Sequence, residues 1–450
     1  ISKGTRDFSP KQLANRDYIF STIKSNFKKF GFQPIETPSF ELSETLLGKY
    51  GEEGDRLIFK ILNSGDKVKK VDLQALEEGN LSRFSNSLTE KALRYDLTVP
   101  FARYVAQYQN DIVFPFKRYQ IQPVWRADRP QKGRFQEFYQ CDADVVGSKS
   151  LWQEIEFIQL YDAVFSDLNL DGVTIKINNR KILAGIAELI GAQDKLIDFT
   201  VALDKLDKIG EAKVKEEMLN KGIPAEGISK LQPLFNLTGD FNEQLQSLKS
   251  ILNSSTEGLK GVEELEFIAF SVASLGLKTA SLQMDVTLAR GLNYYTGAIF
   301  EVSAPESVQM GSIGGGGRYD DLTGIFGLKG VSGVGISFGL DRIYLVLEEL
   351  NLFPTDKAIS TKVLFINFGT EESLYCLKAI ALLRSKSIST ELYPDPVKLK
   401  KQMVYCNKRE IPFAVMVGTS EMAQNKYMYK DMSSGEQQLL TLEQLTEKVS

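Results

Sequence analysis

The chain has 450 residues, of which 43% are hydrophobic, 25% charged and 10% aromatic, and its formal net charge is −4. This composition is typical of a globular protein and excludes a disordered or fibrous one; a usual domain length of ~100 to 200 residues predicts roughly three domains. The acidic balance excludes a protein that coats nucleic acid by bulk attraction, so any RNA contact must be local.

The counts of histidine and cysteine narrow the chemistry further. The chain contains no histidine, which excludes histidine-based triads, HExxH zinc sites and imidazole general bases. Its three cysteines form no CxxC pair, so neither a disulfide framework nor a thiolate zinc site is indicated. No apolar run approaches the ~20 residues of a membrane span, and residues 1–10 are charged where a signal peptide would be apolar. We therefore expect a cytoplasmic protein without a membrane partner.

The first element predicted in the chain is an amphipathic helix. Ser9 and Pro10 are typical of an N-cap and a first-turn proline, and apolar residues then recur at helical spacing until Gly31. Short strands and helices are expected to alternate from there to about residue 90. Within this region, the polar, lysine-rich and serine-rich stretch 63–90 predicts a loop or a peripheral helix.

Residues 116–126 and 135–146 predict the two strands of a long antiparallel hairpin, joined by the polar segment 127–134. Alternation places polar residues on one face of each strand: Arg118, Gln120, Gln122 and Arg126 on the first, and Gln136, Gln140, Asp142 and Asp144 on the second. Periodicity alone favours a solvated face, since antiparallel sheets commonly expose one side. The turn, however, crowds four cations together, which favours a bound polyphosphate or RNA end: Arg126, Arg129, Lys132 and Arg134.

The remaining elements divide into a helical part, a second strand region and a final α/β part. Residues 181–275 predict an inserted helical domain, after which strand-like sequence returns at 282–302 and 331–338, so the main sheet is expected to be split by the insertion. Residues 360–450 alternate strand and helix, as a compact α/β domain does. One helix there is basic, and a solvated face and a phosphate-tracking face stay equally open for it: Lys398, Lys400, Lys401, Lys408 and Arg409.

Two further features bear on nucleotide binding. Arg342 stands in the expected first turn of a helix that begins near Leu340, where the macrodipole disfavours a cation. A bound triphosphate tail would remove that conflict, and an arginine whose head reaches into water is the equal alternative. The run Gly314–Gly317 predicts a glycine turn or a very close backbone approach. No Walker A sequence and no GxGxxG after a strand occurs, so arginines on an antiparallel sheet would have to hold a nucleotide.

Three segments resemble the signature motifs of class II aminoacyl-tRNA synthetases. Glu36, Thr37 and Pro38 resemble motif 1, residues 116–147 motif 2, and the string GlyIleSerPheGlyLeuAspArg at 335–342 motif 3. More specific strings resemble the histidyl-tRNA synthetase family: LysGlyThrArgAsp (3–7), ArgGlyLeuAsnTyrTyrThrGly (290–297) and GlyGlyArgTyrAsp (316–320). The family usually has aspartate where this chain has Asn293.

The resemblance implies an α+β catalytic domain on an antiparallel sheet, formed by residues 1–180 and 276–352. Residues 181–275 would be its helical insertion and residues 360–450 an α/β anticodon-binding domain. The implied reaction is the ATP-dependent ligation of L-histidine to the 3′ end of tRNA(His) through a histidyl-adenylate, releasing AMP and pyrophosphate. Mg²⁺ would accompany the ATP phosphates, and the enzyme would be a homodimer.

The resemblance also implies roles for single residues. Arg126 and Arg290 would be the catalytic pair, on opposite sides of the α-phosphate. ATP would be held by Arg126, Arg134, Phe138 and Arg342. Histidine would be held by Asp96, Thr98, Gln140, Asp144, Arg290, Tyr294, Tyr295 and Tyr319. The acceptor end of the tRNA would meet Arg129 and Gln131.

Two alternatives come from different classes of protein. The regulatory subunit of ATP phosphoribosyltransferase resembles the catalytic core without charging tRNA, but it generally lacks the anticodon-binding domain. A class II enzyme for another amino acid is the second alternative, and the ArgGlyLeu and TyrTyr signature argues against it. The arginines at 126, 290 and 342, together with the complete C-terminal part, favour the ligase.

Overall fold

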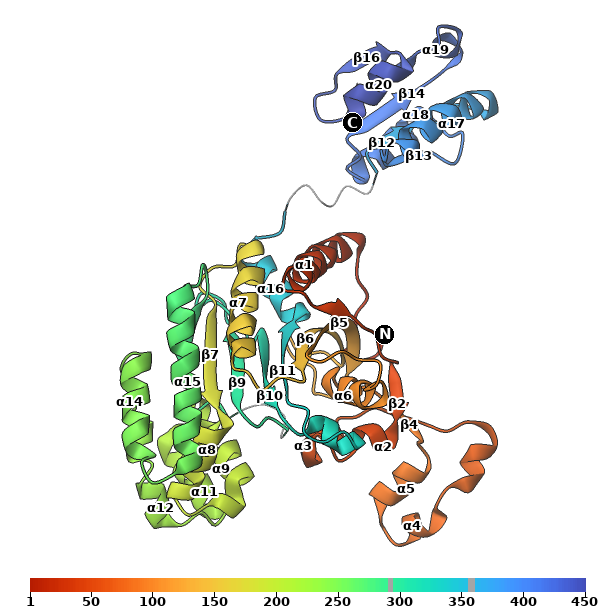
Figure 1. Ribbon diagram of the computed structural model, residues 1–450. Helices are drawn as coiled ribbons and strands as arrows, with labels where there is room; N and C mark the ends of the chain where they lie inside the picture. Colours follow the sequence, from red (N-terminus) through yellow and green to blue (C-terminus); the bar gives the residue numbers. More distant parts are fainter. Residues whose placement is uncertain (290–293, 355–360) are drawn as a thin grey trace. The chain divides into compact units, whose positions relative to one another are not determined.

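The computed structural model describes residues 1–289, 294–354 and 361–450, and it divides into two compact units, Ile1–Phe353 and Pro354–Ser450 (Figure 1). Arg290 and Asn293 lie outside the described residues. Among the described residues, no helix combines the length and the apolar character that crossing a bilayer requires.

The first unit is built on an eight-stranded sheet whose central six strands are antiparallel neighbours and whose outermost pair on each side is parallel. The predicted hairpin is confirmed, because two of these strands pair from Phe116↔Val146 to Trp125↔Glu137. In spatial order the strands are β1 (Gln33–Pro34), β5 (Phe116–Trp125), β6 (Glu137–Val146), β11 (Gly333–Gly339), β10 (Gly314–Tyr319), β9 (Ala298–Ser303), β7 (Thr174–Asn179) and β8 (Ser281–Met284).

One face of the sheet is covered by helices. α1 (Pro10–Lys29) begins at the predicted N-cap Ser9, whose side chain accepts from the Gln12 N–H, and it packs against α7 (Trp152–Asp167) and α16 (Leu340–Glu349). Its Phe27 ring lies 5.3 Å from Tyr119 of β5 and 5.9 Å from Phe338 of β11. Because side chains alternate along a strand, the polar residues of the hairpin must point to the opposite face.

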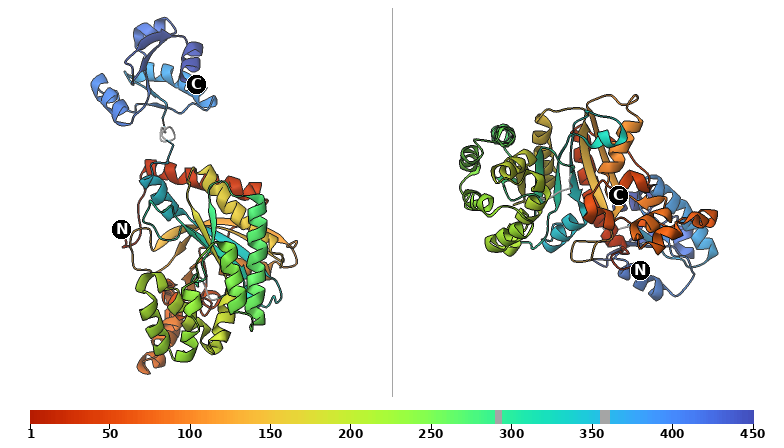
Figure 2. Two further views of the ribbon diagram at one scale, coloured as in Figure 1. Left: turned by 90° about the vertical axis from the view of Figure 1, so that its left-hand side faces the viewer. Right: turned by 90° about the horizontal axis from the view of Figure 1, so that it is seen from below.

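The segment that was expected to be an insertion consists of helices joined by short turns, and its helices gather beside the β7–β8 edge of the sheet in Figures 1 and 2. Its buried side chains belong to the same hydrophobic cluster as those of the sheet, so it shares the core of this unit. The helices are α8 (Arg180–Leu189), the 3-10 turn η2 (Gln193–Lys195), α9 (Leu196–Leu203), α10 (Leu206–Ile209), α11 (Glu211–Asn220), α12 (Ala225–Ser229), α13 (Gln232–Phe235), α14 (Phe241–Ile251) and α15 (Thr256–Leu275).

A three-stranded sheet lies in the region between α1 and the hairpin, in the order β2 (Phe40–Leu42), β4 (Lys91–Leu93), β3 (Lys60–Ile61). The polar stretch 63–90 connects β3 to β4 and is largely short helices, in agreement with the peripheral helix predicted. The remaining helical elements of the first unit are α2 (Ser43–Leu46), α3 (Gly51–Arg56), η1 (Gly65–Lys70), α4 (Leu73–Glu77), α5 (Leu81–Ser87), α6 (Thr98–Gln107) and η3 (Leu322–Phe326).

The second unit is the predicted α/β fold. Its five-stranded sheet has three parallel strands followed by two antiparallel ones and its own apolar core. The strands in spatial order are β13 (Thr390–Leu392), β12 (Val363–Phe365), β14 (Phe413–Met416), β15 (Tyr427–Asp431) and β16 (Gln437–Leu440). The helices are α17 (Thr370–Ser385), α18 (Leu399–Lys408), α19 (Thr419–Ala423) and α20 (Leu442–Val449).

Candidate active site

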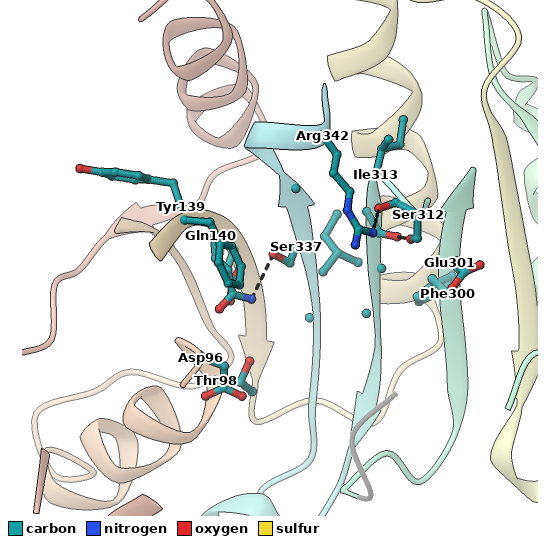
Figure 3. A pocket seen from close by; sticks show the side chains of 18 of the residues that line it. Asp96, Thr98, Tyr139, Gln140, Phe300, Glu301, Ser312, Ile313, Ser337 and Arg342 are labelled. Atoms are coloured by element: carbon teal, nitrogen blue, oxygen red, sulfur yellow. Dashed lines mark hydrogen bonds between the residues drawn. The ribbon is translucent and has the colours of Figure 1, made fainter. Parts of the chain in front are cut away.

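A cavity of about 340 Å³ lies on the face of the main sheet away from α1, with β6, β9, β10 and β11 contributing to its walls. Figure 3 shows Arg342 and Ser312 at one end, Asp96 and Thr98 at the other, and Gln140 with Ser337 between them. The cavity brings together all the sequence-predicted histidine-binding and ATP-binding residues within the described ranges. The predicted Arg290 lies outside those ranges.

Three arginines line the cavity, and Figure 3 shows one of them, Arg342, at the end opposite Asp96. Arg126 lies with its guanidinium carbon 4.1 Å from the centre of the Tyr95 ring and 5.2 Å from that of Phe138, and its Nε donates to the Tyr95 carbonyl over 3.0 Å. Arg134 is half-exposed, with a guanidinium nitrogen 3.6 Å from an oxygen of Asp128. Such a crowd of cations favours an anionic ligand.

Arg342 is the third residue of α16 and completes this end. Its Nε donates to the Gly133 carbonyl over 2.9 Å and its Nη1 to the Ser312 carbonyl over 2.6 Å. The alternative of an arginine reaching freely into water is therefore wrong. Burial, followed by repulsion from Arg134, lowers the pKa of Arg342, and an anion at this end would relieve that repulsion.

The end of the cavity at which Figure 3 shows Asp96 and Thr98 carries buried carboxylates. Asp96 accepts hydrogen bonds from the Tyr50 hydroxyl (2.8 Å), the Val99 N–H (3.1 Å) and the Tyr294 hydroxyl (3.3 Å), and burial raises its pKa. Thr98 hydrogen-bonds Tyr294 through its side chain. These contacts fix Asp96 at the start of α6, so the carboxylate has one fixed direction into the cavity.

Asp144, which also lines the cavity, is fixed in a similar way. It pairs with Arg118 at 2.8 Å, and its Oδ1 accepts from the Tyr319 hydroxyl over 2.6 Å. Burial raises the pKa of Asp144, while the Arg118 cation opposes that rise. Arg118 is fully buried and Asp144 is 2% exposed. The solvated sheet face that periodicity favoured is therefore wrong, because the polar face of the hairpin lines a covered site.

Tyr294 and Tyr295, which precede β9, line the cavity together with the carboxylates. Their rings meet edge to face with centroids 4.9 Å apart, and burial raises the pKa of both phenols well above that of an exposed tyrosine. Both therefore stay protonated; the Tyr294 hydroxyl already donates to Asp96, so Tyr295 is the phenol that can donate to a polar ligand.

Glycines give the cavity its space. Gly314–Gly317 is not a turn, as the alternative expectation had it, but the first part of strand β10. A Cβ at Gly316 would lie 2.1 Å from the Gly335 carbonyl oxygen, and one at Gly335 would lie 1.9 Å from Oδ1 of Asp144. The close approach that the glycine run predicted is thus confirmed.

The predicted tRNA contacts lie on the motif 2 loop at the rim of the site. Arg129 and Gln131 are exposed, and reciprocal backbone bonds between Gln131 and Arg134 (3.2 and 2.9 Å) tighten the loop around Gly133. In the second unit, the basic side chains of α18 and its flanks are also exposed.

Sequence reasoning missed several residues that support the site. Tyr50 and Arg118 hold the two carboxylates, Asp142 lines the cavity between them, and Asp341 accepts 2.5 Å bonds from both Arg6 and Arg16. The alternation along β5 and β6 placed Arg118 and Asp142 on this face, and Asp341 stands in the string that resembles motif 3, but no local signal pointed to Tyr50.

Two family profiles match the chain, one within each of its two compact units. The histidyl-tRNA synthetase family profile matches residues 81–343, and an anticodon binding domain profile matches residues 362–450. A protein of Christiangramia forsetii, named histidine–tRNA ligase, is 68% identical over 437 residues, which span 97% of this chain and 96% of the relative.

Two solved structures are also similar. The histidyl-tRNA synthetase of Nostoc sp. PCC 7120 is 32% identical with a TM-score of 0.80, covering 100% of this chain and 98% of that one. A Bacillus halodurans protein, described as an ATP phosphoribosyltransferase regulatory subunit/histidyl-tRNA synthetase, is 20% identical with a TM-score of 0.70 over 90% of this chain and 96% of its own, and it shares the fold. The matched profiles and the full-length relative establish that this chain belongs to the histidyl-tRNA synthetase family.

Proposed function

We propose that the cavity joins L-histidine to ATP and that the chain then transfers the histidyl group to the 3′ end of tRNA(His). Aminoacylation of that tRNA is the function of the family. The observation that carries the proposal is a single cavity that is lined by three arginines and by buried carboxylates, with Arg342 at the opposite end from Asp96 in Figure 3. A triphosphate and an amino acid with a cationic ammonium group complement those two ends.

The activation step needs no protein nucleophile. An oxygen of the histidine carboxylate attacks the α-phosphorus, and the bond from that phosphorus to the bridging oxygen breaks, so pyrophosphate leaves. Arg126 would neutralise the charge that develops on the α-phosphate and hold the reactants in line. Resemblance assigns the opposite side of the phosphate to Arg290.

The arginine end would hold the rest of the nucleotide. Phe138 would stack on adenine, while Arg134 and Arg342 would bind the β- and γ-phosphates. Mg²⁺ prefers one or two carboxylates plus phosphate oxygens and water. No cluster of three or more candidate metal ligands occurs in the part of the chain that the structure describes. Asp128 and Glu301 line this end and fit that mode of binding, in which Mg²⁺ supplies further charge neutralisation.

The carboxylate end would select the amino acid. Asp96, Thr98 and Gln140 would bind the α-ammonium, whereas Asp144 and Tyr295 would bind the two ring nitrogens. An apolar side chain of similar size would leave the buried carboxylate and phenol without partners, and such mismatches reject a wrong substrate strongly. Tyr294 and Tyr319 would line the pocket around the ring.

The exposed residues Arg129 and Gln131 would meet the acceptor end of the tRNA, so that its terminal ribose reaches the adenylate. After transfer, AMP leaves. The exposed cations of α18 would contact tRNA phosphates, a role that salt dependence of tRNA binding would reveal.

We also propose a homodimer that works in the cytoplasm. Phe40 and Leu42, which follow the motif 1 residues 36–38, are 48% and 50% exposed on the edge strand β2. Apolar side chains on an exposed edge strand favour a protein partner. Sedimentation that shows an active monomer would contradict the dimer.

Charging of purified tRNA(His) with labelled histidine tests the proposed function, with Arg126→Ala as the variant. The wild type should form acid-precipitable histidyl-tRNA in an ATP-dependent manner, and the variant should lose most of that activity. A wild type that binds histidine but charges no tRNA would favour the regulatory-subunit alternative instead. The match of residues 362–450 to an anticodon binding domain argues against that alternative.

A further inference from the structure

Asp142 lies on β6 between Gln140 and Asp144, on the face that lines the cavity, and the roles proposed above do not use it. It is 2% exposed, and no donor among the described residues reaches its Oδ1. The same holds for Oε1 of Gln140, two residues earlier on the same face. Buried acceptors without a donor are costly, so a pair of them at a cavity indicates a ligand with several N–H groups.

Ser337 of β11 hydrogen-bonds the Asp142 carboxylate, but no donor among the described residues reaches Oδ1. The partner of Asp142 across the hairpin is Gln120, whose Nε2 donates to Thr37 Oγ1 (2.8 Å) and to Gln122 Oε1 (2.5 Å). Gln122 Oε1 is itself fixed as an acceptor by Arg94 Nη1 (3.1 Å) and by the Thr37 N–H (3.2 Å). The amide nitrogen of Gln120 is therefore committed, and its Oε1 is one more acceptor without a donor among the described residues.

Asp96 can accept only part of the hydrogen bonds of an ammonium group. A carboxylate offers about four lone-pair positions, and Asp96 already accepts from Tyr50, Val99 and Tyr294. An ammonium group has three N–H donors, of which Asp96 can take one. The Thr98 side chain, the other group proposed for the ammonium, already hydrogen-bonds Tyr294, whereas Gln140 Oε1 and Asp142 Oδ1 have no donor among the described residues and can take the other two.

We propose, on the basis of the function proposed above, that Asp142 is a further specificity-determining residue, whose carboxylate accepts a hydrogen bond from the α-ammonium of the bound amino acid.

The charges around Asp142 make this contact sensitive to pH. Burial is the largest cause that raises the pKa of Asp142 to about 7, and Arg118 opposes it. The groups that face it come from β5, β6, β11, α7 and the segments before α6 and β9: Arg118, Cys141, Asp144, Ser337, Tyr161, Asp96 and Tyr295. As pH rises through 7, Asp142 loses its proton to the solvent and becomes the stronger acceptor for a cation. Its contribution to histidine binding should therefore grow between pH 6 and 8.

Asp142→Asn keeps the shape of the side chain and removes its charge. In ATP–pyrophosphate exchange at pH 8, the variant should raise the KM for histidine roughly ten- to a hundredfold, as loss of a charged hydrogen bond does, with little change in the KM for ATP. The ratio of variant to wild-type KM should rise from pH 6 to 8, because titration of the substrate is common to both proteins. Glu156→Gln, which removes a half-exposed carboxylate paired with Lys117, should leave both constants unchanged.

The ammonium itself is tested with the histidine analogue in which a hydroxyl replaces the amino group. Asp142→Asn should weaken binding of histidine far more than binding of this analogue; equal losses, or a KM ratio that does not vary with pH, would overturn the proposal. If the variant does not fold, the wild type still decides: its preference for histidine over the analogue must rise with pH through 7, and a flat preference would overturn the proposal. Histidine-dependent exchange by the wild type tests the proposed function separately.

Discussion

Gly335 is predicted to be essential for the carboxylate that reads the side chain of the substrate. It is the cross-strand partner of Asp144, and a Cβ added there would lie 1.9 Å from Asp144 Oδ1 and 2.4 Å from its Cγ. Asp144 is short and buried, so in Gly335→Ala it must turn away from both Arg118 (2.8 Å) and Tyr319 (2.6 Å).

The size of the effect follows from the bond that the substrate would lose. A hydrogen bond to a charged group contributes about 1.5–3 kcal/mol, which corresponds to roughly 10- to 150-fold in affinity. In ATP–pyrophosphate exchange, the KM for histidine should therefore rise at least about tenfold. The KM for ATP should stay nearly constant, because Asp144 pairs with Arg118, which is not one of the arginines proposed to hold ATP.

Gly324→Ala is the matched control, since the nearest atom to its new Cβ would be Lys329 Cγ at 3.8 Å, an ordinary contact. This variant should keep both constants. Thermal unfolding of both variants would verify that they are folded. A folded Gly335→Ala protein with the wild-type KM for histidine would refute the role given to Asp144.

Three other substitutions separate the parts of the site. Tyr319→Phe removes the 2.6 Å bond to Asp144 and should raise the KM for histidine about tenfold, and an unchanged KM in the exchange assay would contradict that contact. Arg342→Ala should raise the KM for ATP strongly while histidine binding, measured by calorimetry, stays intact; weakened histidine binding would count against the two-ended cavity. Glu154→Gln breaks the buried bidentate pair with Arg318 (2.6 and 2.7 Å), which should cost about 3–5 kcal/mol of stability, so a wild-type melting temperature would argue against its structural importance.

Alternation along the hairpin predicted which residues share a face but not what covers that face. Arg118 and Gln120 were correctly placed together, yet both are fully buried where a solvated surface was the commoner expectation. Asp96, Tyr294 and Tyr295 enclose that face, and they come from parts of the chain before and after the hairpin. A period of two carries no information about such contacts.

The contacts that hold the site in place could not be predicted from the sequence for the same reason. Tyr50 supports Asp96 from 46 positions away, and Arg6 and Arg16 reach Asp341 across more than 300 positions. Tyr50 and Arg16 stand in no distinctive local pattern, and the strings that contain Arg6 and Asp341 do not reveal that these two side chains meet. By contrast, the N-cap of α1 and the strands of the hairpin depend on neighbours within a few residues, and these predictions are confirmed.

The helical segment between β7 and β8 shows what the periodicity of the sequence could not predict. Its helices were predicted from periodicity, but their burial in the same cluster as the sheet was not. The four-part division of the chain stays a prediction, as do the roles of Arg290 and Asn293, which lie outside the described residues.

The most direct test of the proposed function is ATP–pyrophosphate exchange by the wild-type protein with each of the twenty amino acids in turn. A cavity with arginines for the triphosphate and a carboxylate–phenol pair for an imidazole predicts exchange with histidine alone. Exchange with another amino acid would contradict the proposed selection by Asp144 and Tyr295, and no exchange in a protein that still binds histidine would contradict the ligase itself.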